Sequence, residues 1–185
     1  MSRIPLRYLA DVSGRVGWHG LSTADYLDEG AWLVTGTDIV AGRVAWPSCH
    51  RVAEERWQQD PRIQLAVGDV LVTKDGTVGK IAHVDRVPGL VTLNSGVFRI
   101  RPLGAIDGRF LFWVFQSQLF LDFMGFLSRG STIDHLSQRD IVRFQVPVSG
   151  LNVQRNIAVF LDREAARPWR GNPPHRSIGR AGDAD

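Results

Sequence analysis

The sequence predicts an α/β (α+β) fold: a curved mixed sheet of short strands around a buried helix, followed by an amphipathic helix near the C-terminus. Three observations favour it. Short apolar runs separated by turn residues fill positions 70–100, a mostly apolar segment covers 110–127, and apolar residues recur at helical spacing over 153–161. A chain of 185 residues, 44% of them hydrophobic, can bury one sizeable core. We therefore expect one domain with short appendages.

The N-terminal part alternates apolar runs with turn residues. Pro5–Ser13 is expected to be an amphipathic entry segment, because its apolar residues have helical spacing (Leu6, Leu9 and Val12). Ala31–Thr35 predicts a short strand that Gly36–Asp38 closes with a turn. Arg51–Pro61 is charged and expected at the surface, where Pro61 would end any helix.

The middle of the chain predicts the sheet. Val70–Thr73 and Val78–Val84 flank the turn residues Lys74–Thr77, which is the pattern of a β-hairpin. Val91–Leu93 and Val97–Ile100 add two further short strands. Several strands at such close spacing indicate a curved sheet that is mostly antiparallel or mixed.

The segment Phe110–Leu127 predicts the central buried helix of the domain. It is too long and too evenly apolar for a strand, and Asp107 ahead of it can cap a helix. Polar residues interrupt it, so it falls short of the ~18 uncharged residues of a membrane span. Met1–Ala10 lacks the apolar core of a signal peptide. We expect a cytoplasmic protein that does not enter a membrane.

A second helix is predicted after Asn152, a candidate N-cap, and Pro168 would stop it. Its apolar residues share one face and form a candidate subunit interface: Val153, Ile157, Phe160 and Leu161. One domain need not cover that face, so weak homodimerisation is expected. Residues 169–185 have little to bury and are expected to be disordered.

Composition permits nucleic-acid binding without requiring it. The net charge is +3, and Lys74 and Lys80 are the only lysines among 22 basic residues. Arginine suits bidentate contacts with phosphate and guanine, although a GC-rich genome gives the same bias. Cys49 is the only cysteine, which excludes an internal disulfide and a multi-cysteine zinc site. Cys49 and His50 could be a nucleophile and base, but adjacent residues rarely face each other, so an ordinary thiol is favoured.

Several motifs occur in an order that resembles one known family. Trp32–Ile39 precedes Gly68–Leu71 and Gly76–Lys80, and these are followed by Asn94 and by the Phe110-Leu111-Phe112 run. Gly130-Ser131-Thr132 and Phe144–Val148 complete the series. From about Pro5 to Asp162 the chain resembles a target-recognition domain of the specificity (S) subunit of type I restriction-modification enzymes.

The resemblance implies sequence-specific recognition of double-stranded DNA without a cofactor, a metal or catalytic activity. Partner methylation (M) and restriction or translocation (R) subunits would supply the chemistry. On this basis residues 1–150 are the DNA target-recognition domain, 151–168 begin the spacer helix, and 169–185 form the tail. Where the family has a longer proline-rich motif before the last helix, only Pro147 and Gln154 match. One domain with a short helix is what a half-subunit or a truncated copy would have.

Loops supply the candidate DNA contacts. Lys74, Thr77 and Lys80 surround a glycine-permissive turn that phosphate could approach, although a hairpin turn with solvated lysines has the same pattern. The loop after the apolar segment adds hydroxyl and basic groups, or is a simple helix cap (Arg129, Ser131, Thr132 and His135). Arg15, Arg43 and Asn94 lie on further glycine-rich turns.

Two other functions remain open. The chain could be a non-catalytic protein-interaction or regulatory module, an orphan recognition domain that associates through its last helix. A small enzyme using Cys49 and His50, or Asp69 and Asp75, is the weaker alternative, because no orienting partner is evident for either pair.

Overall fold

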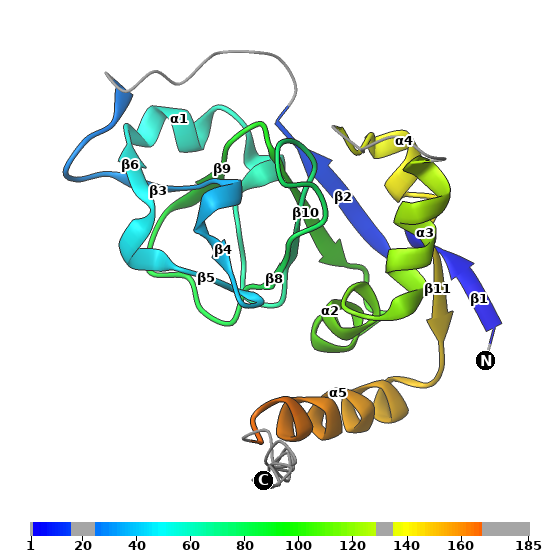
Figure 1. The fold of residues 1–185 in the computed structure, drawn as a ribbon. Coiled ribbons are helices and arrows are strands. Elements are labelled where there is room, and N and C mark those ends of the chain that lie inside the picture. The colour runs from blue at the N-terminus through cyan, green and yellow to red at the C-terminus, as the bar shows by residue number, and fades with distance from the viewer. Residues whose placement is uncertain (1, 16–24, 129–134, 168–185) are drawn as a thin grey trace, which may run out of the picture.

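A computed structural model describes residues 2–15, 25–128 and 135–167 (Figure 1). The strands are β1 (Ser2–Pro5), β2 (Ala10–Gly14), β3 (Ala31–Val34), β4 (Ile39–Val40), β5 (Arg43–Val44), β6 (His50–Val52), β7 (Val70–Thr73), β8 (Ile81–His83), β9 (Val91–Leu93), β10 (Val97–Pro102) and β11 (Gln145–Val148). The α-helices are α1 (Glu54–Gln58), α2 (Gly108–Phe115), α3 (Gln118–Ser128), α4 (Gln138–Ile141) and α5 (Leu151–Ala165). The 3-10 helices are η1 (Leu6–Tyr8), η3 (Gly36–Asp38), η4 (Trp46–Ser48) and η5 (Pro61–Ile63). The α/β (α+β) class is therefore confirmed.

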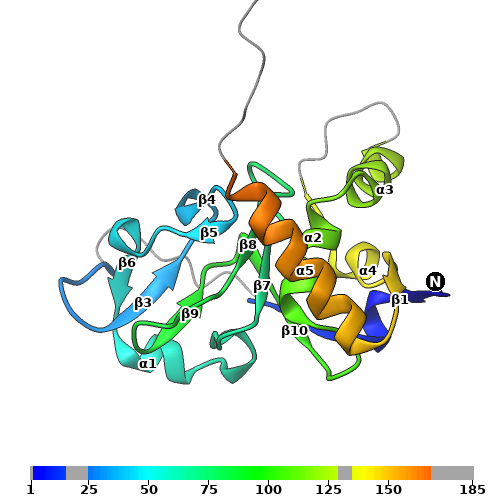
Figure 2. The same cartoon turned by 90° about the horizontal axis from the view of Figure 1, so that it is seen from below.

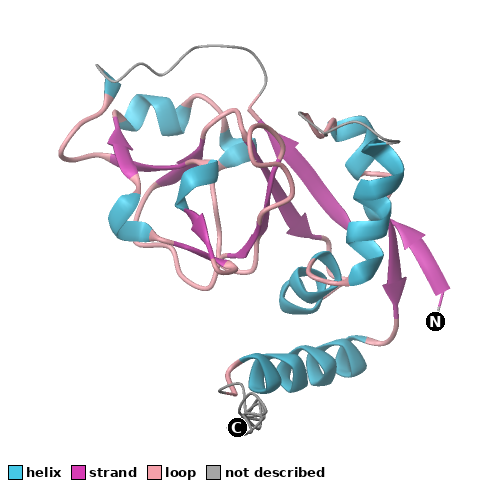
Figure 3. Cartoon of the chain, in the orientation of Figure 1, coloured by secondary structure: helices cyan, strands magenta, loops and turns pink. Residues whose placement is uncertain are grey.

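The strands of the described ranges form two sheets and two separate strand pairs. One sheet has the order β2-β10-β7-β8 and is antiparallel throughout. The other, β6-β3-β9, joins an antiparallel pair to the parallel pair β3–β9. β1 pairs with β11 and β4 with β5, both antiparallel. Figure 3 shows the β6-β3-β9 sheet and helix α3 on opposite sides of β2 and β10.

The four-stranded sheet is buried on both faces, which explains its continuous apolar runs. Successive side chains of a strand point to opposite faces. Val70 and Val72 accordingly pack with the core residues of α2 and α3, whereas Leu71 packs with residues of β3 and β9. The sheet thus separates two apolar layers and holds the turns at its ends in fixed positions.

The predicted hairpin and the predicted helix cap are both present. β7 pairs with β8 in antiparallel register, with Val72 opposite Ile81. The Oδ1 atom of Asp107 accepts a hydrogen bond from Phe110 N at 3.0 Å at the start of α2. α1 ends before Pro61, which begins η5.

The entry segment Pro5–Ser13 has apolar residues at helical spacing, but it forms η1 followed by β2. Ala10–Gly14 pairs with β10 over its whole length, which fixes an extended backbone. Leu6, Leu9 and Val12 are nevertheless all buried. Apolar residues three positions apart can therefore all face the core in a 3-10 turn followed by a strand, and not only in a helix.

The segment Phe110–Leu127 is also not a single helix. α2 and α3 are bent by 54° at Gln116 and Ser117, where the Ser117 hydroxyl donates to Val114 O at 2.6 Å. α2 is largely buried, but in α3 only Phe120 is buried. No single helix in the described ranges is long and apolar enough to cross a membrane, and α2 and α3 reach that length and composition only as a bent pair.

The last helix, α5, lies along α2 (Figure 2). Its N-cap is Gly150, without a side-chain bond, so the predicted cap at Asn152 is wrong. α5 ends at Ala165, while Pro168 and the tail at 169–185 lie outside the described residues. Its buried residues are Gln154 and Ala158, each one position after a predicted interface residue and hence about 100° around the helix.

Candidate nucleic-acid interface

Three turns that are distant in sequence enclose a polar hollow of 470 Å³. They follow β3, β7 and β9, and the parallel pairing of β3 with β9 brings two of them side by side. The lining residues are Thr35, Gly36, Thr37, Asp75, Gly76, Thr77, Lys80, Asn94, Ser95 and Gly96. We call this site the polar hollow. It brings together three residues predicted from the sequence: Thr77, Lys80 and Asn94.

The first turn is built by a capping box. Thr35 N donates to Asp38 Oδ2 at 2.8 Å, and the Thr35 hydroxyl accepts from Thr37 N. Asp38 is buried, and its other oxygen accepts from the Ser48 hydroxyl at 2.8 Å. These bonds hold η3 rigidly and leave Thr37 exposed on the rim of the polar hollow.

The second turn is organised by Thr73, which sequence reasoning missed as a site residue. Its buried hydroxyl donates to Thr77 O at 2.5 Å and accepts from Lys80 N at 2.9 Å. Gly76 and Gly79 have φ of 70° and 86°, in the left-handed region that favours glycine. Thr77 is thereby presented to solvent by its backbone.

Asp75 is fixed by partners on two sides. Lys74 Nζ lies 3.3 Å from its Oδ2 atom, and His135 Nδ1 contacts its Oδ1 atom. Partial burial favours a higher pKa of Asp75, but the hydrogen bond with His135 and the charge of Lys74 outweigh it, so that the pKa lies below its usual range. The carboxylate is therefore ionised, oriented and, at 41% exposure of the side chain, accessible.

Both hairpin lysines make polar contacts within the fold. The Lys74 side chain is only 13% exposed and its ammonium lies 5.4 Å from the centre of the Phe98 ring. Lys80 Nζ donates to Gly36 O at 3.1 Å and ties the second turn to the first. The alternative interpretation of solvated lysines on a hairpin turn is therefore wrong for Lys74, whereas Lys80 is partly exposed and also bonds within the fold.

The side chains of Asn94, in the third turn, and of Arg15 also form hydrogen bonds within the fold. Asn94 Oδ1 accepts from Gly96 N at 3.0 Å, which closes the turn after β9. The Arg15 guanidinium donates to Leu93 O at 3.2 Å and to the Thr92 hydroxyl at 3.4 Å. Burial lowers the pKa of Arg15. Arg15 therefore fixes the end of β9, from which the third turn begins.

The other predicted DNA contacts are distributed differently. Arg43, on β5, is 72% exposed, and its nearest carboxylate is Asp85 at 3.8 Å. His135 reaches the edge of the polar hollow through Asp75. Arg129, Ser131 and Thr132 lie outside the described residues.

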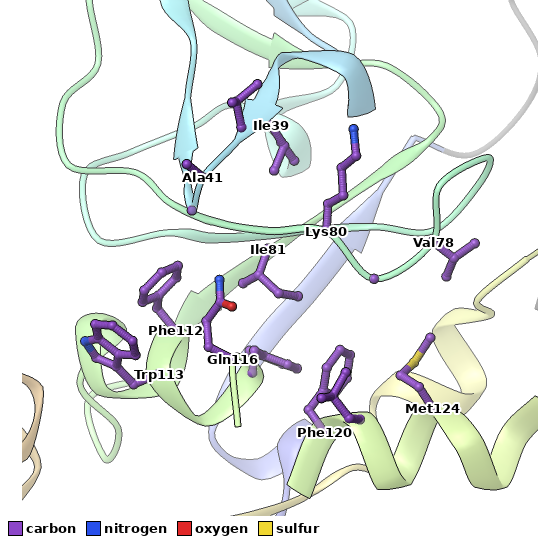
Figure 4. Close-up of a pocket in the computed structure, with 15 residues that line it drawn as sticks. Ile39, Ala41, Val78, Lys80, Ile81, Phe112, Trp113, Gln116, Phe120 and Met124 are labelled. Carbon is purple, nitrogen blue, oxygen red and sulfur yellow. The ribbon is translucent and has the colours of Figure 1, made fainter. Parts of the chain in front are cut away.

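An apolar groove of 830 Å³ lies on the other side of the second turn (Figure 4). Lys80 lines both hollows. The groove walls come from the β4–β5 hairpin, from Val78 to Ile81, and from α2 and α3. Figure 4 shows the Gln116 amide between Phe112 and Ile81. The second turn thus separates a polar surface from an apolar one.

The groups considered for catalysis have structural roles. Burial, with the neighbouring charge of Asp38, raises the pKa of the Cys49 thiol to about 12, while the His50 ring stacks on Tyr26. Asp69 is buried and accepts two hydrogen bonds from Arg101 at 2.8 Å. The described ranges contain no group of three or more His, Cys, Asp or Glu residues that could hold a metal ion.

The predicted interface on α5 is divided between core and solvent. Val153 and Phe160 are 50% and 60% exposed. Ile157 is partly buried against the main core, and Leu161 is half-buried. Only part of the predicted face is therefore free for another molecule.

The family model of the type I restriction modification DNA specificity domain matches residues 28–165. This chain belongs to that family. No curated protein matches it in sequence. Its fold is similar to a chain in a structure on complex assembly and conformational transition of the type I R-M system, with a TM-score of 0.66 and 19% identity over 88% of this chain.

Two solved specificity subunits have the same fold. For the HsdS subunit from Thermoanaerobacter tengcongensis the TM-score is 0.62, with 18% identity over 87% of this chain. For the type I restriction-modification S subunit from M. genitalium it is 0.59, with 15% identity over 88%. The chain spans 37%, 36% and 39% of the lengths of these three proteins.

Proposed function

We propose that this chain recognises a specific sequence in double-stranded DNA as part of a type I specificity subunit. The observation that carries the proposal is the family match, because residues 28–165 include every residue that lines the polar hollow. Residues 1–150 would be the recognition domain and 151–168 the start of the spacer helix. The chain would do no chemistry itself, and methylation (M) and restriction or translocation (R) subunits would supply it.

The exposed polar groups of the three turns suit contact with a duplex. Thr37, Thr77 and Ser95 offer hydroxyl groups, which donate to phosphates or to either kind of base-edge group. Arg43 supplies an exposed guanidinium that one surface ion pair at 3.8 Å holds only weakly. Lys80, Lys74, Asn94 and Arg15 would act on DNA chiefly by fixing the turns. His135, which the sequence predicts as a direct DNA contact, would act through Asp75.

Binding to fluorescent duplexes at rising salt concentration tests the proposal. A protein that neutralises phosphates loses affinity linearly in log salt, so a flat response would overturn it. Arg43→Ala should reduce the salt slope by about 1. Arg167→Ala is the matched control. Arg167 lies just after α5, and its side chain is also 72% exposed.

The polar hollow itself is tested by Thr77→Glu. Thr77 is exposed and its side chain is not needed for the turn, so the fold should be unchanged while the new carboxylate repels the duplex. Affinity for all duplexes should fall about tenfold or more, the equivalent of about 1.4 kcal/mol. Unchanged affinity, with an unchanged melting temperature, would place the duplex elsewhere.

A protein-interaction role is the second candidate. Val153 and Phe160 expose apolar surface on α5, which could pack against a partner subunit or a second copy of the chain. So small a patch supports only weak homodimerisation, of about micromolar affinity or weaker.

A further inference from the structure

The polar hollow differs chemically from a phosphate site. Among the described residues that line it, Lys80 is the single cation, and its ammonium is bound to Gly36 O. Asp75 adds an ionised carboxylate, which repels phosphate. The other lining side chains are neutral hydroxyls and an amide. A group that donates hydrogen bonds fits this chemistry better than an anion does.

Asp75 is held as a fixed acceptor. Its Oδ1 and Oδ2 atoms each contact one basic group, His135 and Lys74. The backbone beside it is fixed as well, because Lys74 N donates to Gly96 O at 2.8 Å and Leu136 N donates to Lys74 O at 2.8 Å. Two carboxylate oxygens have about four acceptor positions, so capacity remains for a further donor. A rigid acceptor discriminates between ligands more sharply than a mobile one.

We propose that Asp75 is a specificity-determining residue that accepts a hydrogen bond from the exocyclic amino group of a cytosine in the major groove. The proposal rests on the proposed function and names its recognition chemistry. In the major groove cytosine offers an N4 donor, whereas guanine offers two acceptors and thymine one. Adenine has an N7 acceptor beside its N6 donor. A carboxylate therefore favours cytosine and repels the other bases to differing degrees.

Selection from a pool of random duplexes, followed by sequencing, tests this with the full chain. Wild type should recover a motif with cytosine at one position, and Asp75→Ala, which removes the acceptor, should lose the preference at that position alone. Affinity for the selected duplex should fall about 5- to 100-fold, as for the loss of one good base contact. Affinity for unrelated duplexes should stay equal or rise, because a negative charge is removed. Arg43→Ala, the control, should weaken all duplexes about equally and keep the motif.

A modified duplex tests the contact without changing the protein. Replacing the selected cytosine by 2-pyrimidinone, which lacks the amino group, should weaken wild-type binding as much as Asp75→Ala does. The two changes together should cost no more than either alone. If wild type selects a motif that Asp75→Ala retains, or if the amino group proves dispensable, the role of Asp75 is overturned while the proposed function stands. If wild type selects no motif, both fall.

Discussion

The buried amide of Gln154 joins α5 to the N-terminus of α2 by accepting a hydrogen bond from Asp107 N at 2.8 Å. Its Nε2 atom donates to Ala105 O at 3.1 Å and to Ser149 O at 2.7 Å. All three partners are backbone groups, and the side chain is fully buried. A buried amide is stable only when its polar atoms are satisfied, and here the three bonds do so.

We predict that Gln154→Ala lowers the free energy of unfolding by about 2 to 4 kcal/mol, because the partner groups lose their hydrogen bonds inside the protein. Urea denaturation measures the change. Gln145→Ala is the matched control, since Gln145 is exposed and its amide donates to Arg143 O, two positions away. Its effect should stay within about 0.5 kcal/mol. Equal effects of the two substitutions would contradict the role of Gln154.

Thr73→Val should disturb the second turn of the polar hollow. The substitution keeps the shape of the side chain but removes the hydroxyl that bonds Thr77 O and Lys80 N. We expect a loss of about 1 to 3 kcal/mol in unfolding free energy and weaker duplex binding. Thr92→Val is the control, because Thr92 is also buried but its hydroxyl accepts a longer bond, of 3.4 Å, from Arg15. If Thr73→Val left both stability and duplex binding unchanged, the backbone bonds alone would be sufficient to hold the turn.

His83 should make stability depend on pH. Burial and the nearby charge of Arg109 lower the pKa of His83, and its Nδ1 atom is buried without a hydrogen-bond partner in the described ranges. In the unfolded chain His83 binds a proton at about its ordinary pKa of 6.5, whereas in the folded protein it binds the proton only at a lower pH. Stability therefore falls as pH decreases below about 6.5. His83→Gln should reduce the difference in melting temperature between about pH 7.5 and about pH 5.5.

Self-association should depend on the exposed part of α5. Replacing Val153 and Phe160 together by Asp should abolish any weak dimer seen by sedimentation at rising protein concentration, without lowering the melting temperature, because both side chains are largely exposed. Ile157→Asp would instead test folding, since Ile157 packs against the core. A dimer that persists in the Val153 and Phe160 variant must use another surface.

Local signals in the sequence predicted the elements that local contacts form. The β7–β8 hairpin and the Asp107 cap are both set by residues within a few positions of each other. The role of Gln154 was not predictable, because hydrophobic periodicity assigns a polar residue to the exposed face. The hydrogen bond of Lys80 was also not predictable, since its partner Gly36 lies 44 positions away in the sequence.

The pairing of β1 with β11 has a consequence for the order of folding. Ser2 lies opposite Val148, so this ladder closes almost the whole described chain into one loop. Closing a longer loop costs more conformational entropy, and contacts at large sequence separation form late. The β7–β8 hairpin can nucleate early, whereas the terminal ladder closes late. Amide hydrogens of β1 and β11 should therefore exchange with solvent earlier than those of β7.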